Sequence, residues 1–214
     1  MESIRWIVVV MLAALSLDLG IAWAEESSRQ LSAQAQEECD LGRRAKERST
    51  RLAHFEKSQK LAERAVALDG QLADAHFALF CSLGERSRID GEKTPAAVFG
   101  FVGVMRELDR TLELNPDHLD ALSSKGAFLI KLPALLGGDT KKGEEMLRRV
   151  IQRDPRSISA RLTLAKTYAA RGKDAEALTL ATEALKFAQA DGRADLIPEA
   201  EATLSELRSR RPAS

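Results

Sequence analysis

One stretch of the chain, residues 156–189, constrains the fold more than any other. Leu164 and Tyr168 lie on the same side of a first predicted helix, which Gly172 interrupts. A second helix follows, with small residues along one side at Ala177, Ala181 and Ala184. Small residues there allow two antiparallel helices to approach closely, with Leu164 and Tyr168 filling the seam. The stretch therefore predicts one complete helix–turn–helix unit.

Residue pairs that end helices recur along the chain. Helix-ending pairs stand at Asp69-Gly70, Asn115-Pro116, Asp154-Pro155 and Asp191-Gly192. Gly70 and Pro116 are 46 residues apart, and Pro116 and Pro155 are 39 apart, so a period of about 34 residues leaves short insertions. The segments 84–95 and 132–139 supply them. Helix pairs are therefore expected at about 27–68, 71–114, 117–153 and 156–189, followed by a capping helix at about 196–210.

The spacing of the marker residues within one unit suggests a known repeat. With Tyr168 at position eleven, Gly172, Ala177 and Ala184 fall at positions fifteen, twenty and twenty-seven. This pattern resembles the tetratricopeptide repeat (TPR), whose period is about 34 residues. Arg161 stands where that repeat usually has an aromatic residue. The resemblance implies an all-α fold, a TPR-like α-solenoid of about four helix pairs plus a C-terminal capping helix.

The central part of the chain carries a more specific set of turn residues. They are Leu114-Asn115-Pro116, Lys131-Leu132-Pro133, Leu136-Gly137-Gly138-Asp139 and Lys142-Gly143. These residues resemble those of exported bacterial TPR proteins of the T-component type, which are associated with TRAP (tripartite ATP-independent periplasmic) solute transporters. For this chain the resemblance implies docking to a periplasmic solute-binding protein and a small apolar or organic-acid ligand. Independently of it, Gly137 and Gly138 predict a turn, and Asp139 predicts the N-cap of the next helix.

The first 24 residues have the features of a signal peptide. Arg5 supplies a positive charge, residues 6–17 are nearly all apolar, and Ala22-Trp23-Ala24 offers small residues to signal peptidase. The apolar run is shorter than the ~20 residues of a spanning helix. We therefore expect cleavage after Ala24, a periplasmic or secreted location, and no membrane span in the mature chain of residues 25–214. An uncleaved membrane anchor is the alternative.

The composition gives no sign of chemistry or of nucleic-acid binding. Basic and acidic residues balance at 32 each, which is no nucleic-acid signal. The three histidines, at positions 54, 76 and 118, lack metal-ligand spacing, and neither cysteine lies in a CxxC motif or beside a base. We expect no catalytic site, no metal and no cofactor. Cys39 and Cys81 are expected to be free or buried thiols, with a disulfide as the alternative in an oxidising compartment.

Candidate contact residues come from two sources. In TPR arrays the first helix of each pair lines the surface that holds peptides, and position carries this role to Phe77, Cys81, Ser124, Lys131, Thr163 and Lys166. The stretch 96–105 is apolar on all sides, which fits a buried helix, a strand, or a patch that binds a ligand or partner through Val98 and Phe101. We interpret the chain as a non-catalytic periplasmic scaffold for protein partners, with a transport accessory as the alternative.

Overall fold

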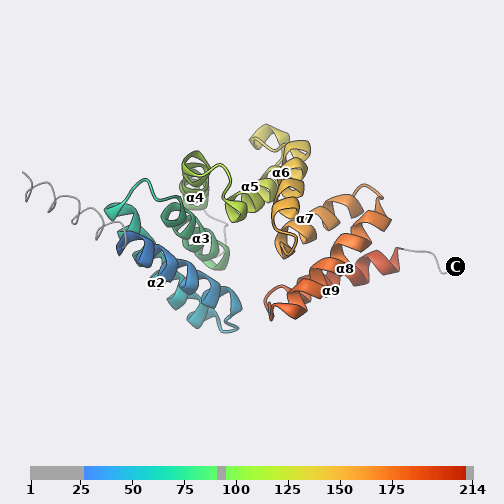
Figure 1. Ribbon diagram of the computed structural model, residues 1–214, viewed down its shortest axis with the longest axis horizontal. Helices are drawn as coiled ribbons and strands as arrows, with labels where there is room; N and C mark the ends of the chain where they lie inside the picture. Colours follow the sequence, from blue (N-terminus) through green and yellow to red (C-terminus); the bar gives the residue numbers. More distant parts are fainter. Residues whose placement is uncertain (1–26, 91–94, 211–214) are drawn as a thin grey trace, which may run out of the picture. The chain divides into compact units, whose positions relative to one another are not determined.

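The structure is a computed structural model that describes residues 27–90 and 95–210 (Figure 1). All the regular secondary structure in these ranges is helical, so the prediction of an all-α fold is confirmed. Contacts between Cα atoms divide the chain into two compact units, with the division between Leu114 and Asn115. The predicted signal peptide, residues 1–24, lies outside the described residues.

Unit 1 is built from two antiparallel helix pairs. The first joins a helix over residues 27–44 to α2 (Arg48–Leu68), and the second joins α3 (Ala73–Asp90) to α4 (Pro95–Leu114). Three helices meet where Ala35, Ala62 and Ala78 are fully buried against one another. A side chain no larger than a methyl group on each helix allows this close approach.

Polar contacts also fasten the first helix of unit 1 to α2. The carboxylate of Glu38 lies 2.7 Å from His54 Nδ1 and 2.6 Å from Lys57 Nζ. Burial alone raises the pKa of Glu38, but the hydrogen bonds and positive charges of His54 and Lys57 outweigh it and hold the pKa below its ordinary value. Ser58 Oγ adds a buried hydrogen bond of 2.7 Å to the carbonyl of Ala35.

Cys39 and Cys81 form a disulfide, which corrects the expectation of two free thiols. Their Cα atoms lie 6.5 Å apart, within the reach of about 7 Å that the bond allows. The approach is close because buried Ala35 and Ala78 lie about one helical turn before the two cysteines and keep the helices together. The bond therefore links the helix over residues 27–44 directly to α3, and Phe55 packs against it.

The helix α3 is longer than predicted. The sequence predicts a loop over residues 84–95, but α3 continues to Asp90. The buried carboxylate of Glu85 accepts hydrogen bonds from Arg43 Nε at 2.9 Å and from Arg88 at 3.1 Å. These tertiary contacts stabilise a helical turn whose polar composition by itself suggested a loop.

The apolar stretch 96–105 is helical and belongs to α4, which excludes the strand interpretation. The interpretation as a buried helix fails at Phe101 and Val102, which are 39% and 62% exposed, while Val104 is buried. A methyl group added at either glycine of the stretch would meet nothing within 4 Å. These glycines therefore do not serve a close helix contact.

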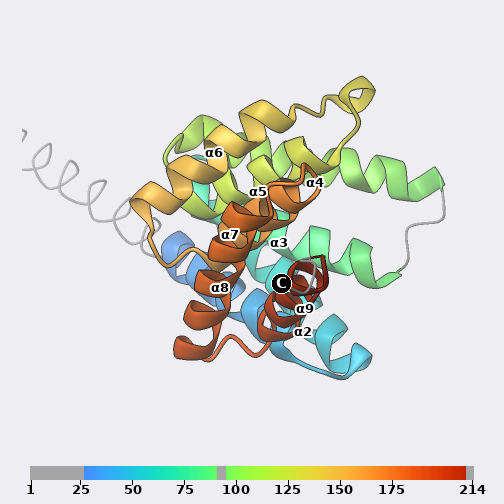
Figure 2. The same ribbon diagram turned by 90° about the vertical axis from the view of Figure 1, so that its right-hand side faces the viewer.

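Unit 2, taken by itself, is also built from antiparallel helices (Figures 1 and 2). Its elements are α5 (Leu119–Lys131), the 3-10 turn η1 (Ala134–Leu136), α6 (Thr140–Arg153), α7 (Ile158–Ala169), α8 (Asp174–Ala190) and α9 (Ile197–Ser209). The helices α5 and α6 form one pair and α7 and α8 the next. The helix α9 packs on α7 and α8, where the sequence predicts a cap.

Small residues bring the helices of unit 2 together as they do in unit 1. The predicted alanines at 177, 181 and 184 are completely buried. In the preceding pair, a Cβ added to Gly143 would lie 2.6 Å from the carbonyl oxygen of Gly126. The backbones of α5 and α6 therefore touch at this crossing.

Replacing Cys39 and Cys81 with serine should lower the free energy of unfolding by about 3–4 kcal/mol, because the disulfide closes a loop of 42 residues. Urea denaturation of residues 25–214 measures the loss, and reduced wild-type protein is the matched control because it should lose a similar amount. Peptide mapping under non-reducing conditions that finds two unlinked thiols would contradict the pairing.

Candidate functional site

Unit 2 presents two surfaces on opposite sides of α7. With about 3.6 residues per helical turn, Thr163 and Lys166 face away from Leu164 and Tyr168. The first two residues lie among the predicted partner contacts, and the last two line a pocket. The same helix therefore separates the two candidate sites.

The first surface is formed by the first helices of successive pairs, α5, α7 and α9, with α7 contacting both of the others. Lys166 Nζ on α7 lies 2.6 Å from the carboxylate of Glu199 on α9, and both side chains are about half exposed. Thr163 Oγ1 donates to the carbonyl of Ser159 at 2.9 Å, and Ser124 lies half-buried on α5. We call this surface the A-helix face and define it by Ser124, Thr163, Lys166 and Glu199.

Two of the predicted contact residues lie in the core of unit 1 instead. Phe77 is 6% exposed with its ring centroid 5.6 Å from that of Phe80, and Cys81 is 2% exposed in the disulfide. The helix over residues 27–44, α2 and α4 all pack around α3. They cover the side of α3 that carries Phe77 and Cys81. Both predictions of an exposed contact are therefore wrong. The side chain of Val98 lies outside the described residues.

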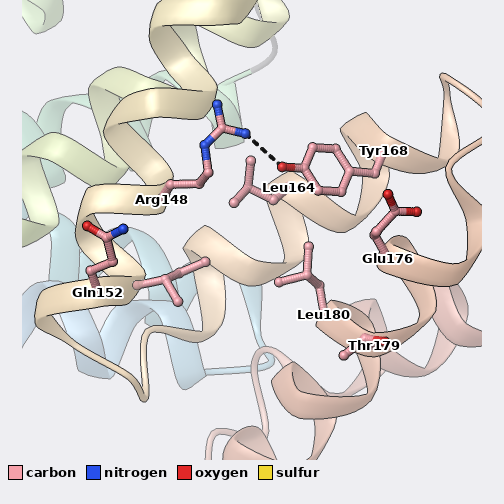
Figure 3. A pocket seen from close by; sticks show the side chains of 8 residues that line it. Arg148, Gln152, Leu164, Tyr168, Glu176, Thr179 and Leu180 are labelled. Carbon is pink, nitrogen blue, oxygen red and sulfur yellow. Dashed lines mark hydrogen bonds between the residues drawn. The ribbon is translucent and has the colours of Figure 1, made fainter.

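The second surface is a pocket of about 400 Å³ between α6, α7 and α8 (Figure 3). Its lining residues are Arg148, Ile151, Gln152, Leu164, Tyr168, Glu176, Thr179 and Leu180. The aliphatic members provide apolar walls. At the rim Arg148 points toward Tyr168 and donates a hydrogen bond of 2.8 Å to its hydroxyl oxygen. The pocket can thus hold an apolar group beside a positive charge.

A buried carboxylate holds that positive charge in place. Glu144 is buried on α6, and its carboxylate accepts a hydrogen bond from Arg148 and forms an ion pair with Arg171. Burial lowers the pKa of Arg148, but the hydrogen bond to Tyr168 and the charge of Glu144 outweigh it and raise the pKa above its ordinary value. As an arginine, Arg148 is cationic in any case, and these contacts fix the position of its charge. The sequence gives Tyr168 a structural role only, and nothing in the repeat pattern singles out Arg148.

The turn between α5 and α6 has the geometry that its glycines predict. Gly137 has a φ of +85°, and a Cβ on Gly138 would lie 1.8 Å from the carbonyl oxygen of Leu132. The predicted N-cap is confirmed, because Asp139 Oδ1 accepts a hydrogen bond of 3.0 Å from the amide of Lys142. We call residues 133–138 the leucine turn, since it exposes Leu135 and Leu136. The predicted contact Lys131 lies exposed at the end of α5 that leads into this turn.

The histidines have structural partners. His76 Nδ1 lies 2.7 Å from buried Glu107, and its Nε2 lies 3.2 Å from the carbonyl of Gly70. His118 caps α5 by accepting a hydrogen bond from the amide of Ala121. Within residues 27–90 and 95–210, no three metal-ligating side chains are grouped to hold an ion. Across the same ranges, no helix combines the length and apolarity needed to cross a bilayer.

Replacing Gly138 with alanine should destabilise the protein by roughly 2 kcal/mol or more, because its Cβ would collide with backbone atoms of Leu132. Replacing Gly100 with alanine is the matched control. The added methyl group meets no atom there, and alanine should stabilise α4 by about 0.5–1 kcal/mol. Thermal unfolding of both variants measures the difference, and equal effects would refute the packing described for Gly138.

Comparison with known proteins supports the repeat interpretation. A family model described as a tetratricopeptide repeat matches residues 134–197. The crystal structure of a thermophilic TPR protein from Thermus thermophilus is similar, with a TM-score of 0.55, 20% identity, and coverage of 92% of this chain and 95% of that chain. No curated protein is similar enough in sequence to count as a match. The fold is that of a TPR-like α-solenoid.

Proposed function

We propose that the protein is a non-catalytic scaffold that binds a protein partner along the A-helix face of unit 2. The observation that carries the proposal is the layer formed by α5, α7 and α9, which exposes the ion pair of Lys166 and Glu199. An exposed pair of this kind contributes little to stability, typically about 0–1 kcal/mol. Its charges therefore remain available to a partner at small cost to the fold.

The chemistry of this face favours a partner segment with an acidic side chain. A carboxylate from the partner replaces Glu199 at Lys166 Nζ, and the freed Glu199 returns to solvent. Thr163 lies on the same side of α7, about one turn before Lys166, and its hydroxyl oxygen can accept a hydrogen bond from the segment. Ser124 on α5 extends the polar surface to the neighbouring pair.

We further propose that the protein works in the periplasm or outside the cell. The signal-like residues 1–24 support this location. The disulfide between Cys39 and Cys81 gives a second line of support, because such bonds persist in oxidising compartments and are rare in the cytosol.

A transport accessory is the second candidate function. It rests on the resemblance of the central turns and on the exposed Phe101 and Val102 of α4, an apolar surface for a solute-binding protein. The two candidates predict different contact surfaces. Charged substitution at Phe101 should abolish capture of a solute-binding protein, whereas the scaffold proposal places the contact on the A-helix face.

Export predicts a defined N-terminus. Protein isolated from the cell envelope should begin at Glu25, and replacing Ala24 with phenylalanine should block cleavage because signal peptidase needs a small residue there. Replacing Ala14 with leucine, inside the apolar run, is the control that should leave cleavage intact. N-terminal sequencing makes the measurement. A chain that keeps Met1 and fractionates with cytosolic proteins would contradict export.

Partner capture tests the scaffold proposal. Residues 25–214 should retain a defined set of envelope proteins. Lys166→Glu should reduce their recovery roughly tenfold, because it places a carboxylate where the partner's carboxylate would bind. Lys186→Glu, an exposed lysine on α8, is the matched control and should change nothing. The charge swap Lys166→Glu with Glu199→Lys restores the ion pair. Because the swap leaves a lysine beside the same position, the result that would refute the direct contact is full capture by the single variant Lys166→Glu.

A further inference from the structure

The leucine turn exposes two adjacent large apolar side chains almost completely. Leu135 is 95% exposed and Leu136 is 67% exposed, compared with 51% for Leu68 at the end of α2. Single exposed leucines are common on protein surfaces. Two neighbouring leucines held out together at the end of a helix pair need a reason, because apolar surface that gathers in one place marks a contact site.

Backbone contacts hold the turn in this shape. The amides of Leu136, Gly137 and Gly138 donate to the carbonyls of Pro133, Ala134 and Pro133 at 2.9–3.0 Å. The amide of Asp139 donates to the carbonyl of Leu129 at 2.9 Å, which ties the end of the turn back to α5. The leucines are therefore carried by an ordered backbone.

Lysines precede and follow the two leucines in the sequence. Lys131 ends α5, and Lys141 and Lys142 lie in the first turn of α6, so all three exposed lysines share one end of the helix pair. Asp139 is the single acidic residue between Lys131 and Lys142, and its carboxylate caps α6. The segment 131–142 thus carries a net positive charge around an apolar tip.

We propose that the leucine turn docks the protein onto the surface of an anionic phospholipid bilayer. Leu135 and Leu136 enter the boundary between headgroups and acyl chains, and the three lysines contact the lipid phosphates. Apolar side chains flanked by lysines are suited to this interface, where burial of apolar surface and attraction to anionic lipid act together. The contact is peripheral and requires no spanning helix.

The shape and charge of the turn favour a bilayer over a protein as its occupant. The two leucines form a protruding tip, which a bilayer accepts without a matching cavity. The pocket between α6 and α8 of a second copy is the competing occupant, but its charged lining residues, Arg148 and Glu176, balance, so it offers the three lysines no excess of negative charge. The proposal does not depend on the A-helix face, which is defined by other residues.

Vesicle binding tests the proposal with residues 25–214, which contain every described contact. The chain should cosediment with vesicles in which about a third of the lipid is phosphatidylglycerol, and only weakly with pure phosphatidylcholine. Raising the salt from roughly 0.1 M to 1 M should weaken binding, because the Debye length falls from about 10 Å to about 3 Å.

Two double variants separate the apolar and the charged contributions. Leu135→Ser with Leu136→Ser should reduce the bound fraction at least roughly tenfold, and Lys141→Gln with Lys142→Gln should reduce it by a similar factor. Leu68→Ser is the matched control and should bind as the wild type does. All these side chains are exposed, so circular dichroism should show unchanged helix.

A fluorescence measurement locates the contact independently. Both tryptophans, Trp6 and Trp23, precede residue 25, so Leu135→Trp places a single tryptophan in the tested chain. Its emission should shift to the blue on adding anionic vesicles, whereas that of Leu68→Trp should not.

Three results would overturn the proposal. The first is no binding of the wild-type chain to anionic vesicles, and the second is equal binding by the serine double variant. The third is self-association in the absence of lipid that the serine variant abolishes, because it would show that a second copy occupies the turn.

Discussion

Close approach of antiparallel helices is the constraint on which this structure depends. The contacts are made where side chains are no larger than a methyl group, as at the fully buried Ala177, Ala181 and Ala184 of α8. At one crossing even a methyl group is too large, since a Cβ on Gly143 would meet the backbone of Gly126. Helices that pack this closely gain many dispersion contacts per residue, which compensates for a chain with few aromatic side chains.

The periodic features of the sequence predict the architecture because small residues and helix ends are local signals. Ala177 and Ala184 identify a packed helix, and Gly172, with a φ of +71°, requires a conformation that glycine adopts easily. The N-cap at Asp139 is equally local. The left-handed turn and the N-cap act within a few positions of themselves, and the spacing of the small residues is visible within one helix, so a single unit is enough to predict them.

The errors concern contacts between residues far apart in sequence. The pairing of Cys39 with Cys81 depends on how closely two helices approach, which spacing along the chain does not determine. Phe77 has the position of a contact residue, but neighbouring helices cover it. The extension of α3 through Glu85 depends on Arg43, 42 residues earlier. In each case the structure depends on contacts between residues far apart in sequence, which a local pattern does not contain.

The two candidate sites also differ in how far the sequence predicts them. Thr163 and Lys166 follow from repeat position alone, although the ion pair with Glu199 does not. The pocket assembles residues from three helices, so the four-residue spacing of Glu144 and Arg148 within α6 predicts a charged helix face and not the pocket. An unaligned sequence shows where the helices of such a protein lie, but pockets between them emerge only with the packing.

The crossing of Gly126 and Gly143 restricts which substitutions the pair of α5 and α6 tolerates. A side chain at either position would strike the partner helix, so the two positions are constrained together. The turn that joins the same helices carries no such restriction at Leu135 and Leu136, whose side chains touch little of the fold. Mutation can therefore remodel the tip of this helix pair, and whatever the tip contacts, while the packing beneath it stays unchanged.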